Sequence, residues 1–340
     1  MRSEKLITVI GCHVGGEQND VITGGVLPPP GATMFEKKLY LEREADWLRR
    51  MLLFEPRGKV TACVNLVVPP TDPRADAGFI IMESVDYPPM SGSNTICTTT
   101  VLLETGMLAM REPETRLLLE TPAGLIPVVA RCRGGRVEQV RFSNVPAFAV
   151  HLDATVEVPE LGSVRVDVAY GGAFFAIVDA ASLGFAISRD EARDLVRIGN
   201  AIRDAAAEQL PAVHPENDAI RRITFTEFAG PWEGPGCVSR NAVIVAPGRI
   251  DRSPCGTGSS ARLAVLHAKG RIRAGESFTH ESIIGARFEV GVESVGELAG
   301  RPAVITSIAG RAFVTGVFQH ALDPEDPWRE GYTLPDTWFV

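Results

Sequence analysis

The sequence is poor in the features that mark binding to nucleic acids or membranes. Its 34 lysines and arginines are outnumbered by 42 acidic residues, and the net charge of -8 argues against a general nucleic-acid-binding face. Aromatic residues make up only 7% of the chain, which offers no stacking platform for bases. No apolar run approaches the roughly 20 residues that span a bilayer. We expect no nucleic-acid partner, no membrane association and, without a recognisable signal peptide, a cytoplasmic protein.

Signatures of metal and cofactor binding are also missing. The chain has no CxxC pair, no HExxH, no GxGxxG, no Walker A motif and no lysine in an evident Schiff-base context. These absences favour a reaction without metal or cofactor. We also expect most of the cysteines to be reduced and to serve only packing. Six cysteines are scattered along the chain: Cys12, Cys63, Cys97, Cys132, Cys237 and Cys255.

One of these cysteines lies in an unusual setting. Residues 251–258 read Asp-Arg-Ser-Pro-Cys-Gly-Thr-Gly, between a strand-like run at 242–245 and a helical run at 261–267. Gly256 and Thr257 keep side chains small, so that backbone amides at the helix start can approach an anion, either a substrate carboxylate or the Cys255 thiolate. The stretch predicts a catalytic thiol with a pKa near neutrality, although a buried packing cysteine is the ordinary alternative.

A second stretch repeats this arrangement. Residues 88–97 (Pro-Pro-Met-Ser-Gly-Ser-Asn-Thr-Ile-Cys) follow a strand-like run at 78–82 and open a helix predicted at 93–104. Ser91 occupies the place that Cys255 has in the other stretch, and Gly92 and Ser93 supply small residues and amides. A plain serine N-cap is the alternative interpretation of Ser91. Two similar half-sites, roughly half the chain apart, indicate two related halves that face each other.

The remaining pattern predicts a chain rich in strands with few helices. Apolar spacing predicts an amphipathic helix at 36–53, and a serine cap, acidic first turn and following proline predict another at 188–210. We place the domain boundary near Pro127, and expect the tail after Asp323 to return to the first half. His13 is a possible functional histidine in a glycine-containing loop, with a loop histidine bonded to backbone groups as the alternative. The strands are predicted at 6–10, 21–26, 60–68, 78–82, 117–119, 125–129, 137–142, 161–168, 173–178, 220–228, 241–245, 288–292, 303–308 and 312–317.

At these motifs the chain resembles the proline racemase superfamily, which includes proline racemase, 4-hydroxyproline 2-epimerase and trans-3-hydroxy-L-proline dehydratase. The resemblance covers most of the chain and is most specific at residues 251–258. Further matches are His-Val-Gly-Gly-Glu at 13–17, Tyr-Gly-Gly-Ala-Phe-Phe at 170–175 and His-Glu-Ser-Ile-Ile-Gly at 280–285. Racemases and epimerases of the family carry a cysteine in both half-sites, with a histidine two residues after the first. Here those positions are Ser91 and Ser93.

The resemblance implies an α+β fold of two pseudo-symmetric domains, similar to diaminopimelate epimerase. Each domain would be a β-sheet or barrel wrapped round a central helix, with the active site in the cleft between them. The first domain would comprise 1–126 and 304–340 and carry Ser91; the second would comprise 127–303 and carry Cys255. The resemblance also implies that Asp251 holds the ring ammonium of the substrate, whereas a solvated or capping acid is the alternative.

The Ser/Cys pair leads us to expect a trans-3-hydroxy-L-proline dehydratase, a lyase that removes the α-proton and the 3-hydroxyl without a cofactor. A serine is a poor base, so two-way racemisation should be weak, whereas dehydration needs acid and base on one face. The alternatives are a 4-hydroxyproline 2-epimerase, with epimerisation either the main activity or a second activity of the same site, and a non-catalytic binder of proline analogues. The expected catalytic residues are Cys255 and Ser91, the substrate-binding residues are Gly92, Ser93, Asp251, Gly256 and Thr257, and the protein would be a monomer or homodimer.

Overall fold

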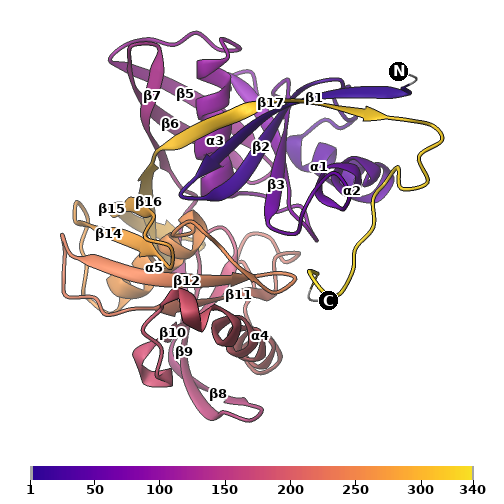
Figure 1. The fold of residues 1–340 in the computed structure, drawn as a ribbon. Coiled ribbons are helices and arrows are strands. Elements are labelled where there is room, and N and C mark those ends of the chain that lie inside the picture. The colour runs from indigo at the N-terminus through magenta and orange to yellow at the C-terminus, as the bar shows by residue number, and fades with distance from the viewer. Residues whose placement is uncertain (1–2, 339–340) are drawn as a thin grey trace. The chain divides into compact units, whose positions relative to one another are not determined.

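The computed structural model describes residues 3–338 as an α+β protein that divides into two compact units (Figure 1). Unit 1 comprises Met1–Phe142 and Gly310–Val340, and unit 2 comprises Ser143–Ala309. The boundaries expected at 126/127 and 303/304 thus fall later along the chain. Strand β6 (Gly124–Arg133) runs through Pro127 and pairs on both sides within unit 1, whereas Val304 exchanges backbone hydrogen bonds with Ala147 of unit 2.

The strands of unit 1 form one continuous series of pairings. In spatial order it is β17-β1-β2-β3-β4-β5-β6-β7; the β2/β3 and β4/β5 pairs are parallel and the other pairs are antiparallel. The bounds are β1 (Lys5–Val14), β2 (Glu17–Gly24), β3 (Ala62–Val68), β4 (Ala77–Met82), β5 (Glu114–Thr121), β6, β7 (Arg136–Ser143) and β17 (Ala312–Leu322). Strand β7 thus ends one residue past the boundary between the units.

Unit 2 repeats this series in the same order and with the same strand directions. It runs β8-β9-β10-β11-β12-β14-β15-β16, with β10/β11 and β12/β14 parallel and the other pairs antiparallel. The bounds are β8 (Phe148–Val158), β9 (Gly162–Tyr170), β10 (Phe174–Asp179), β11 (Ile223–Ala229), β12 (Val238–Val245), β14 (Ser277–Ser282), β15 (Arg287–Leu298) and β16 (Arg301–Gly310), with a short β13 (Arg249–Ile250) beside β12. The two halves therefore share one spatial arrangement of strands, as the paired half-sites indicated, although the strand of unit 1 that corresponds to β8 is β17, from the end of the chain.

One helix occupies the centre of each unit. In unit 1, α3 (Gly92–Glu104) contacts β17 at one end of the series and β6 near the other; in unit 2, α5 (Gly256–Ala268) likewise contacts β8 and β15. A sheet that touches one helix from both ends must curve round it, and Figure 1 shows α3 enclosed in this way. Nearly every residue of both helices is buried. Each starts directly after its half-site, so the sheet fixes the position of each helix N-terminus.

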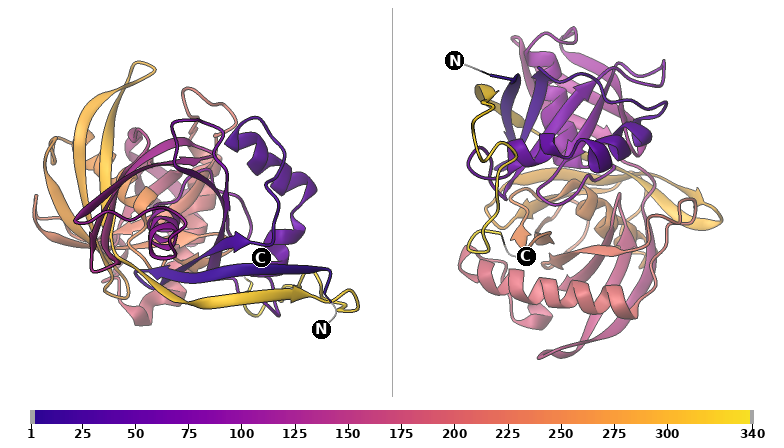
Figure 2. Two further views of the ribbon diagram at one scale, coloured as in Figure 1. Left: turned by 90° about the horizontal axis from the view of Figure 1, so that it is seen from above. Right: turned by 90° about the vertical axis from the view of Figure 1, so that its right-hand side faces the viewer.

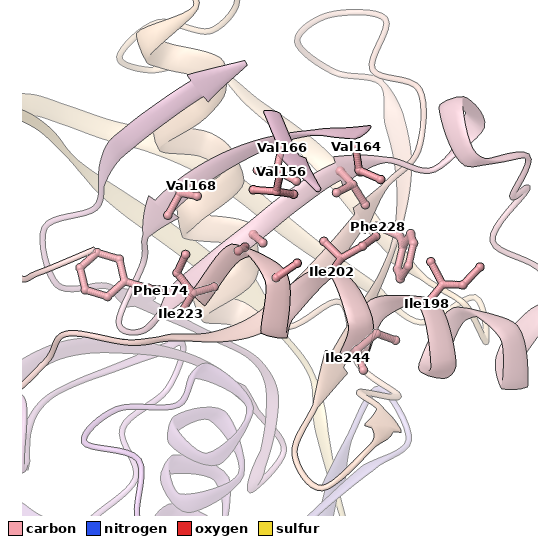
Figure 3. Close-up of a cluster of buried hydrophobic side chains, with 14 of the residues drawn as sticks. Val156, Val164, Val166, Val168, Phe174, Ile198, Ile202, Ile223, Phe228 and Ile244 are labelled. Carbon is pink, nitrogen blue, oxygen red and sulfur yellow. The ribbon is translucent and has the colours of Figure 1, made fainter. Parts of the chain in front are cut away.

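The central strands of unit 2 are apolar on both faces because a helix covers each face. Phe174 and Ile244 belong to the cluster packed against α4 (Ala192–Gln209), shown in Figure 3, whereas their neighbours Phe175 and Val243 pack towards α5. Alternate side chains of a strand point to opposite faces, so one continuous apolar run serves both layers. Figure 2 shows α4 lying along the outer side of this unit.

The predicted helices differ from the structure at their ends. The helix expected at 36–53 is two helices, α1 (Met34–Glu44) and α2 (Trp47–Leu53), because Ala45 leaves helical geometry and the chain restarts at Asp46. The helix expected at 188–210 begins as a short 3-10 turn, η2 (Arg189–Glu191), with the predicted serine in a reciprocal capping box with Glu191. A second 3-10 turn, η1, spans Ala181–Leu183.

The tail after Asp323 returns to unit 1, as expected. Arg57 forms an ion pair with Asp326 at 2.7 Å, Tyr332 bridges to Glu55, and the Trp338 ring packs edge-on against Phe54. Among residues 3–338, no helix is long and apolar enough to span a bilayer.

Candidate active site

The half-site of unit 1 is the start of α3. Ser91 is the N-cap residue, but its side chain makes no capping bond to the first turn. Instead, the side-chain nitrogen Nδ2 of Asn94 donates a hydrogen bond to the Ser91 hydroxyl oxygen at 2.8 Å, and Nδ2 of Asn65 on β3 donates to the side-chain oxygen Oδ1 of Asn94 at 2.7 Å. The first amides of a helix have no partner within the helix, so the Gly92 and Ser93 N–H groups are suited to an anionic ligand. The serine hydroxyl is thus held by neutral amides.

The half-site of unit 2 is the start of α5. Cys255 is the N-cap, with φ at 60°, a left-handed conformation that is uncommon for a residue with a side chain. Its sulfur accepts a hydrogen bond from the Gly258 amide at 3.4 Å and lies 3.5 Å from the Thr257 hydroxyl oxygen. Its own amide donates to the Ser253 hydroxyl at 3.1 Å. Backbone strain held by several local bonds is typical of functional positions.

Asp251 lies in the loop that precedes Cys255. It is 7% exposed, and one of its carboxylate oxygens accepts the Ser253 amide at 2.8 Å. The aspartate, the cysteine and the amides of Gly256 and Thr257 therefore belong to one compact loop and helix start. Pro254 directly precedes the N-cap and lies outside the helix.

The ionisation of Cys255 differs from the expectation drawn from the sequence. Burial raises the pKa of this thiol well above 9, and the charge of Asp251 raises it further. The Thr257 hydroxyl and the Gly258 amide lower it, but these contacts do not offset the loss of solvation. At neutral pH the thiol therefore holds its proton, and the helix N-terminus alone does not make it a thiolate.

A buried polar cluster lies beside the start of α5. Glu227 on β11 and His280 on β14 are both fully buried, with 3.6 Å between the Glu227 Oε1 and His280 Nε2 atoms. Arg262 of α5 donates to His280 Nε2 at 2.9 Å, and the Asn241 amide donates to Glu227 Oε1 at 3.3 Å. His280 Nδ1 lies 2.7 Å from the Ser259 hydroxyl. The sequence interpretation noted His280 only within a motif and missed Glu227, whose one signal was an acidic residue inside an apolar strand.

His13 lies in strand β1, one residue before its end, and is paired with Phe313 and Gln18 rather than placed in the expected loop. Its Nδ1 atom accepts the Gly16 amide at 3.3 Å, and its ring centroid is 5.5 Å from that of Phe313. The bond to a backbone group agrees with the alternative of a histidine without a functional role, although the residue belongs to a strand and not to a loop. Within the described part of the chain, no group of three or more histidine, cysteine or acidic side chains is arranged to hold a metal ion.

The structure brings Ser91, Gly92 and Ser93 together in unit 1, and Asp251, Cys255, Gly256 and Thr257 together in unit 2. The two sets belong to different units. Their joint action on one substrate remains a prediction.

The fold occurs in distant proteins. A phenazine biosynthesis protein of the PhzF family from Bacillus anthracis is 12% identical, with a TM-score of 0.56 over 94% of this chain and 99% of that chain. At that identity the likeness concerns the fold alone.

Two solved structures are much more similar in sequence, and their similarity extends over both half-sites. A hydroxyproline epimerase from Agrobacterium vitis, with bound trans-4-hydroxy-L-proline, is 43% identical, with a TM-score of 0.93 over 99% of this chain and 98% of that chain. A probable proline racemase from Agrobacterium radiobacter, with bound carbonate, is 44% identical, with a TM-score of 0.92 over 98% of each chain. The sequence model of the proline racemase family matches residues 9–333. The chain belongs to the proline racemase family.

Proposed function

We propose that this protein is a hydroxyproline 2-epimerase that inverts Cα of 4-hydroxyproline without a cofactor. The observation that carries the proposal is the match, over nearly the whole chain, to an epimerase with bound trans-4-hydroxy-L-proline. This reverses the order of the two activities expected from the Ser/Cys pair alone, in which dehydration came first.

Two helix starts supply the chemistry in this proposal. Epimerisation breaks the Cα–H bond on one face and forms a new Cα–H bond on the other, with negative charge growing on the substrate carboxylate in between. The amides of Gly92 and Ser93 and those of Gly256 and Thr257 stabilise that charge, and Asp251 holds the ring ammonium. Cys255, protonated at rest, is ready to deliver a proton. Ser91 is the group on the opposite face.

Dehydration of trans-3-hydroxy-L-proline is the second candidate, and Ser91 is the observation that favours it. Loss of the α-proton leaves an electron pair that forms the ring double bond as the C3–O bond breaks, and the departing hydroxide leaves as water after taking a proton. A serine hydroxyl donates a proton or hydrogen bond more readily than it accepts a proton from carbon. Ser91 therefore fits assistance to the leaving group.

The deciding experiment incubates the enzyme with hydroxyproline isomers in deuterated water and follows them by proton NMR. We expect trans-4-hydroxy-L-proline to lose its α-proton signal while the cis-D epimer appears. Formation of a pyrroline carboxylate from trans-3-hydroxy-L-proline, with no exchange of the 4-hydroxy isomer, would replace the epimerase by the dehydratase.

The matched variants are Cys255→Ser and Cys237→Ser. Cys237 is a half-buried free cysteine of the same unit that has no part in the proposed site. Cys255→Ser should lose about 1,000-fold or more in kcat/KM, as expected when a group that transfers the proton is removed, whereas Cys237→Ser should stay near wild type. A wild-type protein that binds hydroxyproline in calorimetry but turns over neither isomer would be a binding protein instead.

A further inference from the structure

Glu227 is a buried acid to which the proposed epimerisation assigns no role. Its side chain is fully buried on β11. Oxygen Oε1 accepts the Asn241 amide at 3.3 Å, whereas Oε2 is buried with no hydrogen-bond partner. An unpartnered buried carboxylate oxygen is costly, so its retention calls for an explanation beyond packing.

The unpartnered oxygen and the sulfur of Cys255 both lie close to the point where a side chain of residue 258 would begin. A Cβ atom built on Gly258 would lie 3.0 Å from Glu227 Oε2 and 3.3 Å from Cys255 Sγ. Both atoms therefore border one small space, which stays open because residue 258 is a glycine. The other close neighbour of that point is a methyl carbon of Val243, at 3.2 Å.

Of the groups around this space described below, Glu227 is the one that changes its protonation state near neutral pH. Burial raises the pKa of Glu227 to about 7, although the charge of Arg262 on α5 and the Asn241 bond from β12 lower it. Burial and Arg262 hold the pKa of His280 on β14 well below 6.5, so the imidazole is neutral. From β10, Ile177 is the register partner of Glu227 and carries no charge.

We propose that Glu227 receives the proton of the Cys255 thiol when that thiol acts as a base, and returns it when the thiol acts as an acid. The S–H bond breaks with its electron pair left on sulfur, and an O–H bond forms at Oε2. One negative charge moves from the carboxylate to the sulfur, and nothing is oxidised or reduced. The inference rests on the proposed catalytic role of Cys255, through which Glu227 acts as a positioning residue.

The proton exchange between Glu227 and Cys255 avoids two neighbouring negative charges in the interior of unit 2. A thiolate beside an ionised Glu227 would place two anions together in a buried setting, with the charge of Asp251 also acting on the sulfur. Transfer of the proton to Oε2 keeps a single charge on the pair, which then titrates as a unit. In unit 1 the fourth strand of the series, β3, carries Asn65, an amide, where the fourth strand of unit 2, β11, carries Glu227, so this device belongs to the cysteine half-site.

The test is the pH profile of kcat/KM for Glu227→Gln, which keeps the size of the side chain and removes its ability to take a proton. In the wild type the acid limb should reflect the loss of the proton acceptor near pH 7. In the variant that limb should move up by at least about one pH unit, so that activity at pH 7 falls about tenfold and recovers at higher pH. A profile that is lowered equally at every pH, or is unchanged, would overturn the inference.

Two further variants separate proton exchange from a structural effect. Glu281→Gln is the matched control, because Glu281 is a buried acid of the same unit whose charge is paired with Arg240 and Arg287; its acid limb should stay in place. Gly258→Ala puts a methyl group 3.0 Å from the oxygen and 3.3 Å from the sulfur, and it should displace the acid limb as Glu227→Gln does. An acid limb that stays in place would count against direct exchange. Failure of the catalytic role itself would appear separately, as full activity in Cys255→Ser.

Discussion

At the scale of single residues, each half-site places one side chain at the N-cap of a central helix, but the two side chains have different chemistry. Ser91 accepts a hydrogen bond from the Asn94 side chain, which in turn accepts one from Asn65, so the side chains that hold it are neutral. Cys255 lies beside the carboxyl groups of Asp251 and Glu227, both of which raise the pKa of its thiol. A hydroxyl among amides is a weak base, and we expect proton removal on the Ser91 face to limit epimerisation.

Ser91→Cys should relieve this limit. A thiol ionises far more readily than an alcohol, so the variant should epimerise 4-hydroxyproline at least about tenfold faster than the wild type. Dehydration of 3-hydroxyproline should fall in the same variant, because a hydroxyl suited to the leaving group is lost. Polarimetry on the 4-hydroxy isomers and NMR detection of the pyrroline product measure the two rates.

The matched control is Ser182→Cys, which adds a thiol at an exposed position. It should leave both rates unchanged. Slower epimerisation in Ser91→Cys would show that Ser91 is not the weak partner.

At the scale of elements, the sequence predicted both half-sites because glycines and small polar residues at a helix start follow local rules. It predicted the sheet-rich fold through the family resemblance and through apolar runs such as 242–245. It missed β8 (Phe148–Val158), whose irregular pairing with β9 breaks the alternation that marks a strand. It also missed Glu227, because only the tertiary structure places β11 beside the start of α5.

Gly171, in the turn between β9 and β10, illustrates how the sheet positions a helix start. A Cβ atom there would lie 2.2 Å from the Thr257 carbonyl oxygen and 2.5 Å from the Ala261 amide nitrogen. Gly171→Ala should therefore push α5 away and destabilise the protein by about 1–3 kcal/mol. It should also reduce kcat/KM at temperatures where the variant is still folded, because the start of α5 is displaced.

Gly296→Ala on β15 is the matched control, because a Cβ atom there would meet nothing within 4 Å. Thermal melts and activity assays of both variants make the comparison. Equal behaviour of the two variants would contradict the close approach between the β9–β10 turn and α5.

At the scale of the whole molecule, buried ionisable groups make stability depend on pH in opposing ways. The pKa of Glu227 is raised from 4.5 to about 7 in the folded protein. The folded carboxyl keeps its proton across this window while the unfolded one releases it, so the stabilising contribution present at low pH is lost as pH rises to 7. The pKa of His280 is lowered by burial, so its contribution is instead lost as pH falls below 6.5.

Glu227→Gln should remove the pH dependence of stability that comes from Glu227 and leave the one that comes from His280. The free energy of unfolding of the wild type, minus that of the variant, should therefore decrease between pH 4.5 and 8 by up to about 3 kcal/mol. Urea titrations at several pH values measure this difference, in which the common contribution of His280 cancels. A difference independent of pH would mean that Glu227 is ionised throughout.

The unequal surroundings of Ser91 and Cys255 also bear on how the proposed epimerisation would run in its two directions. In such an enzyme the group that removes the α-proton in one direction donates a proton in the other. The serine hydroxyl and the cysteine thiol therefore exchange the roles of base and acid when the direction is reversed. The Haldane relation ties the ratio of the two specificity constants to the equilibrium constant, so their pH profiles must run parallel. The asymmetry can then surface only in the separate turnover numbers and Michaelis constants, where each epimer should reach its highest kcat at its own pH.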